Sequence, residues 1–341
     1  MTNLRVGVVG LGYFSQFHLD AWRDIPSTTL AGVFDLDSAR TQEIAAKYGV
    51  SGARSAAELA GQDLDIVDLV APPPAHKALV EQFAKSGRIL ICQKPFCTSY
   101  EEAKAVCEFA KSRDCTLIIH ENFRFQPWHR AIKTALDTGL LGEIYQARFA
   151  LRPGDGRGPD AYLSRQPAFQ SMPRLLIHET GVHFVDLFQY FFGPISSIYA
   201  DLVRLNPAIK GEDAGILIAH HENGTRAVFD GNRLMDHATD SPRRTMGEME
   251  IEGEKGTLRL SGMGEISFRA FGENEAVNIA VTAPVDEARF GGGCVQALCE
   301  HIVEARAGRV PFENTAEDYL SVILATQAAY RSAETGQKQS L

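Results

Sequence analysis

The sequence has no Cys-x-x-Cys pair, although it contains six cysteines. A zinc site of the usual spacing is therefore not expected, and the cysteines are expected to be reduced, buried thiols. The chain also has no apolar run of the ~20 residues that a membrane span needs. It starts directly with a strand-like segment, without a charged and then apolar leader, so we expect a cytoplasmic protein.

An excess of positive charge is absent as well. The net charge is −9, which does not favour a nucleic acid or an anionic membrane as partner. There is no internal repeat and no low-complexity tract. The hydrophobic fraction of 45% and the charged fraction of 23% are typical of a soluble globular enzyme. A chain of 341 residues is too long for one typical core and suits two domains.

The first third of the chain alternates strand-like and helix-like segments, which predicts a parallel sheet with crossover helices. We expect strands at 5–9, 29–34, 66–69, 89–92 and 116–119, and helices at 38–48, 75–86 and 100–112. Ser99 is expected to cap the last of these helices.

After Asn122 the pattern changes to strand-like segments joined by hairpin-like turns such as HENGT and EGEKGT. Strands are expected at 144–151, 195–205, 215–221, 225–233, 248–252, 256–260 and 265–271, and helices near 127–138, 183–192, 294–307 and 316–334. The predicted fold class is α/β. A domain with the parallel sheet covers 1–123, and an α+β domain with a large, mostly antiparallel open sheet covers 124–341.

The N-terminal strand runs into a glycine turn, LRVGVVGLGYFS at residues 4–15. Gly10 permits a tight turn, and Gly12 lets the backbone approach a pyrophosphate. The N–H groups that open the next helix, around Tyr13 and Phe14, would face the phosphate charge. The third glycine of the dinucleotide fingerprint is replaced by Ser15, and the alternative is an ordinary glycine turn in another α/β protein.

Asp35 follows the second strand, about where a dinucleotide ribose would lie, given a spacing of ~20 residues after the glycines. Its carboxylate would accept hydrogen bonds from both ribose hydroxyls and would repel a 2′-phosphate. We therefore expect residues 1–123 to form a Rossmann dinucleotide-binding domain, with NAD rather than NADP as cofactor. Arg40 is the residue that opposes this expectation.

Two further strands end in chemically distinctive residues. In VAPPPAH, residues 70–76, Ala71 and Pro72 would lie against a flat cofactor ring, and His76 opens a helix; a plain turn is the alternative. In ICQKP, residues 91–95, Lys94 would stand at the carboxyl end of the fourth strand. There its amine would favour an alkoxide and polarise a carbonyl product, whereas most lysines are only solvated. Pro95 is expected to restrict the backbone, a cis peptide bond being one way.

The segment IHETGVHFVDLFQYFFG, residues 177–193, predicts a core-packed helix with Glu179 and His183 on one face. His183 is a candidate base because a carboxylate can orient it, although a buried core histidine is the commoner case. In HENFRFQPW, residues 120–128, Asn122 can bind an amide such as nicotinamide, whereas Arg124 and Trp128 suit hinge packing equally well.

Together these segments resemble the glucose–fructose oxidoreductase and inositol dehydrogenase family (Gfo/Idh/MocA). The matching motifs are the turn at Gly10–Ser15, PPxxxH at Pro72–His76, Lys-Pro at Lys94–Pro95, Asn-x-Arg-Phe at Asn122–Phe125, acid-x-x-x-His at Glu179–His183 and the ending AYRSAETGQ at Ala329–Gln337. The resemblance implies that Lys94 and His183 are catalytic and that Glu179 contacts substrate. It implies that the histidine takes a hydroxyl proton while a hydride leaves carbon for nicotinamide, and that the lysine assists.

Two positions depart from the family pattern. Gln93 stands where the family has a glutamate, which is expected to lower the pKa of Lys94 because an opposite charge is lost. Glu179 replaces an aspartate and reaches one methylene further. Gln93 is also expected among the cofactor-binding residues.

The resemblance implies a sugar or polyol as substrate. The HENFRFQPW stretch and the Gln-Lys-Pro variant are most similar to a D-apiose dehydrogenase subgroup, which oxidises an anomeric carbon to a lactone. Arg152, Asp155 and Arg165, with Arg174, are expected to flank the substrate, or else to lie on the surface. A homodimer or homotetramer through the C-terminal sheet is expected, and no metal. The alternatives are a non-catalytic sensor of dinucleotide or sugar, and an NAD-using glycosidase.

Overall fold

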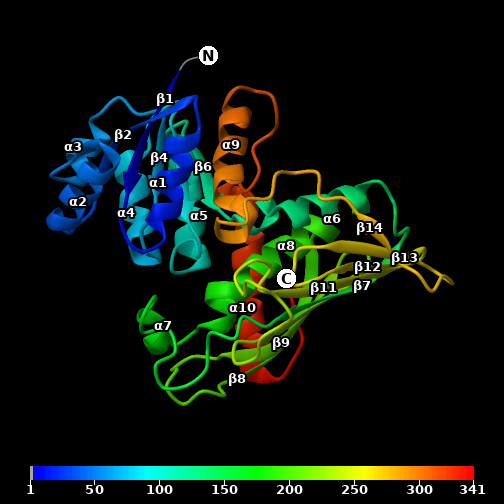
Figure 1. Ribbon diagram of the computed structural model, residues 1–341. Coiled ribbons are helices and arrows are strands. Elements are labelled where there is room, and N and C mark those ends of the chain that lie inside the picture. The colour runs from blue at the N-terminus through cyan, green and yellow to red at the C-terminus, as the bar shows by residue number, and fades with distance from the viewer. Residues whose placement is uncertain (1–2) are drawn as a thin grey trace. The chain divides into compact units, whose positions relative to one another are not determined.

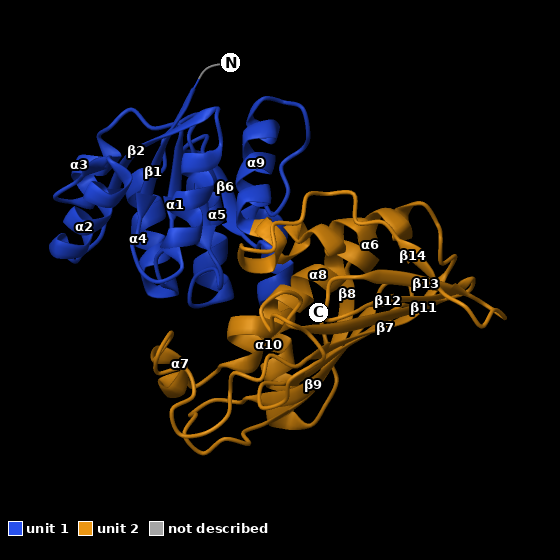
Figure 2. Cartoon of the chain, viewed as in Figure 1, with its two compact units in different colours: residues 1–122, 295–323 blue, residues 123–294, 324–341 orange. Residues whose placement is uncertain are grey.

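A computed structural model describes residues 3–341, which form two compact units (Figures 1 and 2). Unit 1 consists of the chain up to Asn122 together with residues 295–323, and unit 2 of residues 123–294 and 324–341. The chain thus leaves unit 1 one residue before the expected boundary, but residues 295–323 return to it. They do so because the backbone N–H of Ile119 donates to the carbonyl of Asn314, which attaches this segment beside the last strand of the first sheet.

Unit 1 contains a six-stranded parallel sheet in the order β3-β2-β1-β4-β5-β6, with helices on both faces (Figure 1). Its strands are β1 (Leu4–Val9), β2 (Thr28–Phe34), β3 (Ser51–Gly52), β4 (Ile66–Leu69), β5 (Ile89–Gln93) and β6 (Thr116–His120). Its helices are α1 (Ser15–Asp24), α2 (Ser38–Tyr48), α3 (Ala56–Ala60), α4 (Pro73–Phe83), α5 (Tyr100–Ser112), most of α9 (Cys294–Arg306) and the first part of α10 (Ala316–Thr335).

Local sequence accounts for several of these boundaries. The Asp37 side chain accepts hydrogen bonds from Ala39 and Arg40 and starts α2, and Gly49 ends it in a left-handed conformation. Ser99 caps α5 by accepting from the N–H of Glu102, as predicted. Strands β4 and β5 are buried along their whole length, as expected for a parallel sheet covered on both faces.

Unit 2 contains a nine-stranded sheet in the order β14-β13-β12-β11-β7-β10-β9-β8-β15. All its pairings are antiparallel except that of β10 with β7, which confirms the mostly antiparallel prediction. The strands are β7 (Ile144–Leu151), β8 (Ile195–Val203), β9 (Ala214–His221), β10 (Arg226–Asn232), β11 (Gly247–Gly253), β12 (Gly256–Leu260), β13 (Ile266–Ala270), β14 (Val277–Ile279) and β15 (Gln339–Ser340). The helical segments are η1 (Phe123–Phe125), α6 (Pro127–Asp137), α7 (Ala168–Ser171), η2 (Leu176–Gly181), α8 (Val182–Phe192), η3 (Phe290–Gly293) and the end of α10.

One face of this sheet is the core of unit 2. Phe184 of α8 stacks on Phe149 of β7 and Phe229 of β10, with ring centroids 4.0 and 5.2 Å apart. The hydroxyl of Ser332 in α10 accepts the N–H of Ala200 in β8. Alternate residues along these strands are buried, so the period of two in the sequence marks the covered face.

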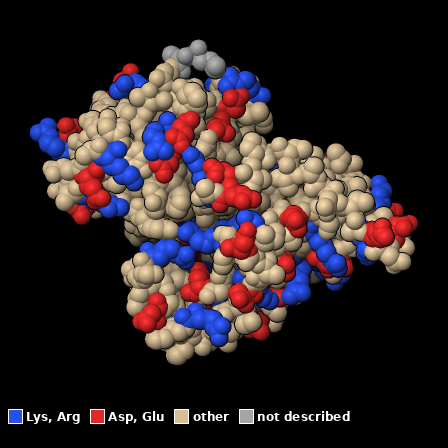
Figure 3. Space-filling model, in the orientation of Figure 1, with Lys and Arg blue, Asp and Glu red and all other residues tan. Residues whose placement is uncertain are grey.

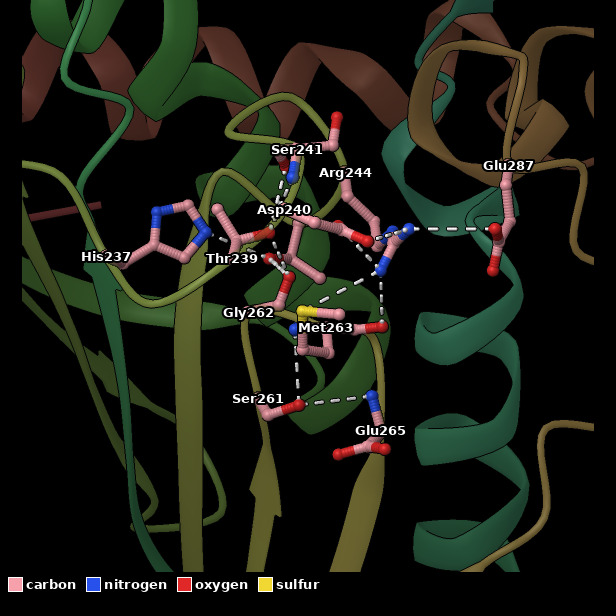
Figure 4. A network of polar contacts seen from close by, with 11 residues as sticks. His237, Thr239, Asp240, Ser241, Arg244, Ser261, Gly262, Met263, Glu265 and Glu287 are labelled. Atoms are coloured by element: carbon pink, nitrogen blue, oxygen red, sulfur yellow. Dashed lines mark hydrogen bonds and ion pairs between the residues drawn. The ribbon is translucent and has the colours of Figure 1, made fainter.

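The loop after β10 is fixed by polar contacts (Figure 4). Thr239 donates to the carbonyl of Gly262, and the Arg244 guanidinium bonds Asp240 and the carbonyl of Met263. His237 bonds the carbonyl of Arg152 at 2.7 Å. This network ties residues 237–245 to the turn between β12 and β13.

Lysine and arginine side chains are interspersed with aspartate and glutamate over the face seen in Figure 3. All six cysteines are buried and unbridged, as predicted. None of the helices within residues 3–341 combines the length and the apolar character that a membrane crossing requires. No cluster of three or more metal-ligating side chains occurs in the same range.

Candidate functional site

The glycine turn lies where β1 meets α1. Gly10 has φ +87°, and a Cβ there would lie 2.4 Å from the carbonyl oxygen of Val70, so only glycine fits. A Cβ at Gly12 would meet no atom within 4 Å, so the backbone there faces open space. Helix α1 follows at Ser15 without a side-chain cap. An open glycine backbone beside an uncapped helix start, at Tyr13 and Phe14, fits a pyrophosphate.

Asp35, at the end of β2, lies directly against this turn. Its Oδ2 accepts the N–H of Leu11 at 2.6 Å, and its Oδ1 accepts the N–H of Asp37 at 2.9 Å. Arg40 donates from Nε to the carbonyl of Leu11 at 3.0 Å, and its side chain is 41% exposed. The carboxylate and the guanidinium are therefore both bonded to the same residue of the turn, and both bear on cofactor choice.

His76 is buried and joins two loops at the carboxyl edge of the sheet. Its Nε2 bonds the carbonyl of Ala71 at 2.8 Å, and its Nδ1 accepts the N–H of Cys97 at 3.3 Å. Burial lowers the pKa of His76, which keeps it neutral. The imidazole thus fixes the loop of Ala71 and Pro72 to the loop that carries Lys94, and its predicted contact to the cofactor stays a prediction.

Lys94 lies just beyond β5, and its peptide bond to Pro95 is cis. The ladder between β5 and β6 ends at the pair Gln93 and His120, directly before Lys94. The side-chain Oε1 of Gln93 accepts that N–H at 3.1 Å. Because β1, β4 and β5 are neighbours, the turns after them meet at one edge of the sheet.

Asn122 and Glu121 continue this edge after β6, and both are buried. The backbone carbonyl of Glu121 accepts from Asn314, and its carboxylate accepts from the Tyr319 hydroxyl at 3.2 Å. The returning segment therefore holds the strand end that places Asn122.

In unit 2, His183 lies in the first turn of α8 and stacks on Phe123, with ring centroids 3.9 Å apart and planes at 2°. Phe123 belongs to the short helix η1. Its neighbour Arg124 forms a bidentate ion pair with buried Asp186, and this pair joins η1 to α8. Arg124 and Phe123 thus fix the ring of His183, and the sequence did not assign Phe123 this part.

Glu179 lies in a π-helical turn, η2, rather than in the α-helix predicted from its spacing to His183. Such turns arise when one extra residue is accommodated, and they are frequent at functional sites. The π-turn is held from outside: Thr180 accepts a hydrogen bond from buried Arg233 at 2.7 Å.

Arg233 links this turn to the long loop after β7. Its other nitrogens donate to the Tyr162 hydroxyl at 2.6 Å and to the Asp155 carboxylate at 3.1 Å. Arg165 also pairs with Asp155, at 3.0 Å. Burial raises the pKa of Tyr162 well above its usual value, so the phenol stays protonated. Asp155 and Arg165 therefore organise the loop, and their part in substrate binding stays a prediction.

The remaining arginines expected near substrate are bonded to protein groups. Arg152 donates to the carboxylate of Asp230 at 2.9 Å and to its backbone carbonyl at 2.7 Å. Burial raises the pKa of Asp230, but hydrogen bonds from Arg148 and Arg152 lower it overall. Arg174 is exposed and lies over the ring of Tyr330 at 4.3 Å.

His129 predicts a loss of stability in acid. It is fully buried, its Nδ1 bonds the carbonyl of Phe123, and burial lowers its pKa to about 4. An unfolded histidine titrates near ~6.5, so between those values the unfolded chain binds the extra proton and stability falls as pH falls. Because of this residue, we expect the free energy of unfolding, measured with urea, to be about 2 kcal/mol lower at about pH 5 than at about pH 7.5. His129→Gln should flatten that dependence; an unchanged pH dependence in the variant would contradict the assignment.

Comparison with known proteins identifies the family to which this chain belongs. Residues 4–121 match the model of an oxidoreductase family with an NAD-binding Rossmann fold, and residues 129–259 match the GFO/IDH/MocA C-terminal domain. The chain belongs to the Gfo/Idh/MocA oxidoreductase family. It is therefore an NAD-binding oxidoreductase, as the resemblance in the sequence implied.

Among its curated relatives is a D-apiose dehydrogenase of Rhizobium rhizogenes, 33% identical over 263 residues that cover 76% of this chain and 74% of the relative. Another D-apiose dehydrogenase, of Paraburkholderia graminis, is 30% identical and covers 98% of this chain and 88% of its own. A solved oxidoreductase from Agrobacterium radiobacter, in complex with NAD+, L-tartaric acid and magnesium, has a TM-score of 0.89 at 28% identity. That match covers 99% of this chain and 98% of the other.

The residues at the edge of the first sheet fit NAD. Gly10 and Gly12 offer an open backbone for the pyrophosphate, and Asp35 offers a carboxylate for the ribose. Ala71, Pro72, Lys94 and Asn122 follow adjacent strands of the same edge, on the side where the nicotinamide half would extend.

Proposed function

We propose that this protein is an NAD-dependent dehydrogenase that oxidises a hydroxyl group of a sugar, with D-apiose as the first substrate to test and its anomeric carbon as the carbon oxidised. The observation that carries the proposal is one edge of the parallel sheet, where an open glycine backbone follows β1, Asp35 follows β2 and Lys94 follows β5. The likeness to two D-apiose dehydrogenases supports the substrate.

The chemistry divides between the cofactor and two side chains. When bound, NAD supplies a nicotinamide ring that accepts a hydride from the oxidised carbon. We assign His183 as the base that takes the hydroxyl proton and Glu179 as an acidic contact to the sugar. Lys94 stabilises the negative charge that develops on the oxygen as its proton leaves. The stacking of His183 on Phe123 restricts the ring to one plane, which suits a base that must face one hydroxyl.

Asp35 sets the preference for NAD in this proposal. Asp35→Asn keeps an acceptor for the N–H of Leu11 and removes the charge that repels a 2′-phosphate. We expect kcat/KM with NADP to rise at least tenfold relative to NAD, since about 1.4 kcal/mol of relative binding suffices. Arg40→Ala, added to Asp35→Asn, should reverse most of this gain because Arg40 supplies the nearby cation. Equal preference ratios in the wild type and Asp35→Asn would show that Asp35 does not read the ribose.

A screen of NAD reduction across aldopentoses, aldohexoses, inositols, open-chain polyols and hydroxy acids tests the substrate. D-apiose should give the highest kcat/KM, with a lactone as product. Hydroxy acids belong in the screen because the neighbour from Agrobacterium radiobacter holds L-tartaric acid. Sugar release from a glycoside without NADH would point to a glycosidase, and binding of NAD and sugar without turnover would point to a sensor; either would overturn the proposal.

We also propose that the open face of the nine-stranded sheet joins copies of the chain. Tyr199, Ile218 and Val228 are cross-strand neighbours on β8, β9 and β10, and they point away from the core. Arg148 of β7, which is ion-paired, is the next cross-strand neighbour in this row. The row therefore combines apolar and charged groups, which suits a self-complementary contact. Ile218→Lys should reduce the mass measured by light scattering, whereas Glu101→Lys on α5 should not. A monomeric wild type would refute this assignment.

A further inference from the structure

Beneath Lys94, three buried side chains from three different elements form a hydrogen-bonded chain. Gln93 at the end of β5 contacts Nε2 of His18 in α1 through its own Nε2, at 2.8 Å. Nδ1 of His18 contacts Oδ2 of Asp68 in β4 at 2.7 Å. His18 and Asp68 are fully buried and Gln93 nearly so. With the bond from the N–H of Lys94 to Oε1 of Gln93, the chain runs from the backbone of Lys94 into the centre of unit 1.

The donors and acceptors in this chain permit a single arrangement. The N–H of Lys94 can only donate, so the oxygen of the Gln93 amide must face it and the NH₂ group must face His18. Nε2 of His18 must then accept, which leaves its only proton on Nδ1. That proton is donated to Oδ2 of Asp68, which also accepts the indole N–H of Trp22 at 2.8 Å. A protonated Nε2 would place two donors against each other at a buried site, where unsatisfied polar groups are costly.

We infer that Gln93, His18 and Asp68 are positioning residues for Lys94, and that the NH₂ group of Gln93 donates to Nε2 of His18, which places the ring proton on Nδ1. This inference rests on the proposed function in so far as Lys94 takes part in the reaction. Oε1 of Gln93 accepts the N–H of Lys94 at 3.1 Å, and the chain so helps to fix the backbone from which the amine extends.

Two aromatic rings pack against His18. The ring of His120 in β6, itself titratable, is tilted by 37° to it with centroids 4.1 Å apart, and Phe14 contacts it edge-on. The titratable groups around Asp68 besides His18 are the thiols of Cys92 and Cys299. Burial is the largest cause that raises the pKa of both thiols, and nearby charges, among them Asp68, raise it further. Both thiols therefore stay protonated. Asp68 is the one carboxylate among these groups.

Nitrogen NMR of the histidine-labelled full chain tests the inference without any need for activity. His18 is assigned by the signal that disappears in His18→Gln. In the wild type we expect the ring proton on Nδ1 and an unprotonated Nε2 that accepts from Gln93. In Gln93→Glu the carboxylate requires a donor, so both nitrogens of His18 should carry protons. Gln62→Glu, which adds the same charge elsewhere in unit 1, should leave His18 unchanged. A wild-type imidazolium, a proton on Nε2, or no response to Gln93→Glu would overturn the inference.

Kinetics then test the positioning role. His18→Leu removes both hydrogen bonds, and kcat should fall about tenfold or more, as small displacements of a reacting group do. The KM for NAD should stay within about twofold, because the hydrogen bonds that His18→Leu removes join protein groups and do not bind NAD in the ground state. His18→Gln offers one donor and one acceptor on its amide and should restore kcat to within about threefold of the wild type. Equal kcat in His18→Leu and the wild type would overturn the positioning role. A wild type without dehydrogenase activity would refute the proposed function and leave the NMR result intact.

Discussion

Replacing Lys94 or His183 by alanine should each lower kcat for NAD reduction about a hundredfold or more, because each variant removes a group that we propose to handle the proton or the charge of the hydroxyl. The dissociation constant of NAD should change little, since we propose the glycine turn and Asp35, and not these two residues, as the contacts to the pyrophosphate and the ribose. Stopped-flow measurement of NADH formation and fluorescence titration of NAD separate the two effects.

Two matched variants control for general damage. Lys85→Ala and His220→Ala remove the same side-chain types from positions outside the site, and both should retain activity. If Lys94 and His183 act on one hydroxyl, the double variant should be hardly slower than the slower single variant, as for residues that act as a unit. Undiminished turnover in either single variant would remove that residue from the mechanism.

The second large effect is expected on stability. Asp155→Ala leaves the buried guanidinium of Arg233 without the carboxylate that lies 3.1 Å from it. Breaking a buried pair in this way costs several kcal/mol, and we expect the free energy of unfolding to fall by about 3 kcal/mol. Urea unfolding of the variant measures this loss. Asp160→Ala, in the exposed part of the same loop, should change it by less than about 0.5 kcal/mol.

The double variant Asp155→Ala/Arg233→Met separates this account from substrate binding. With both charges gone, the loss should be clearly smaller than the sum of the two single losses, because neither charge is left unpaired. The sequence offered Asp155 as a substrate ligand instead. In that case Asp155→Ala would raise KM for the sugar at unchanged stability, which would contradict the structural role.

Much of this architecture could be predicted from local patterns. The alternation of apolar strands and amphipathic helices gave the Rossmann sheet, and strand ends such as Ile66–Leu69 coincide with the prediction. The glycine turn was recognisable because each glycine has a separate physical need, and Gly10 indeed leaves no room for a Cβ. Short elements such as β3 and β15 were missed because two residues carry no periodicity.

The supporting contacts could not be predicted because they join distant parts of the sequence. Gln93 and His18 are 75 residues apart, and Arg233 and Thr180 are 53 apart. A single histidine in an amphipathic helix resembles any core residue, and a single arginine after a strand resembles any surface residue. The π-turn at Glu179 was missed for a different reason: the apolar spacing after it fits an α-helix, and the extra residue leaves no mark on that spacing.

The most direct test of the central claim is the fate of the hydrogen on the oxidised carbon. The best sugar of the screen, deuterated at that carbon, is incubated with the enzyme and NAD, and the nicotinamide product is analysed by NMR and mass spectrometry. The account predicts one deuterium at C4 of the NADH for each sugar oxidised. NADH without deuterium, or sugar consumed without NADH, would contradict it.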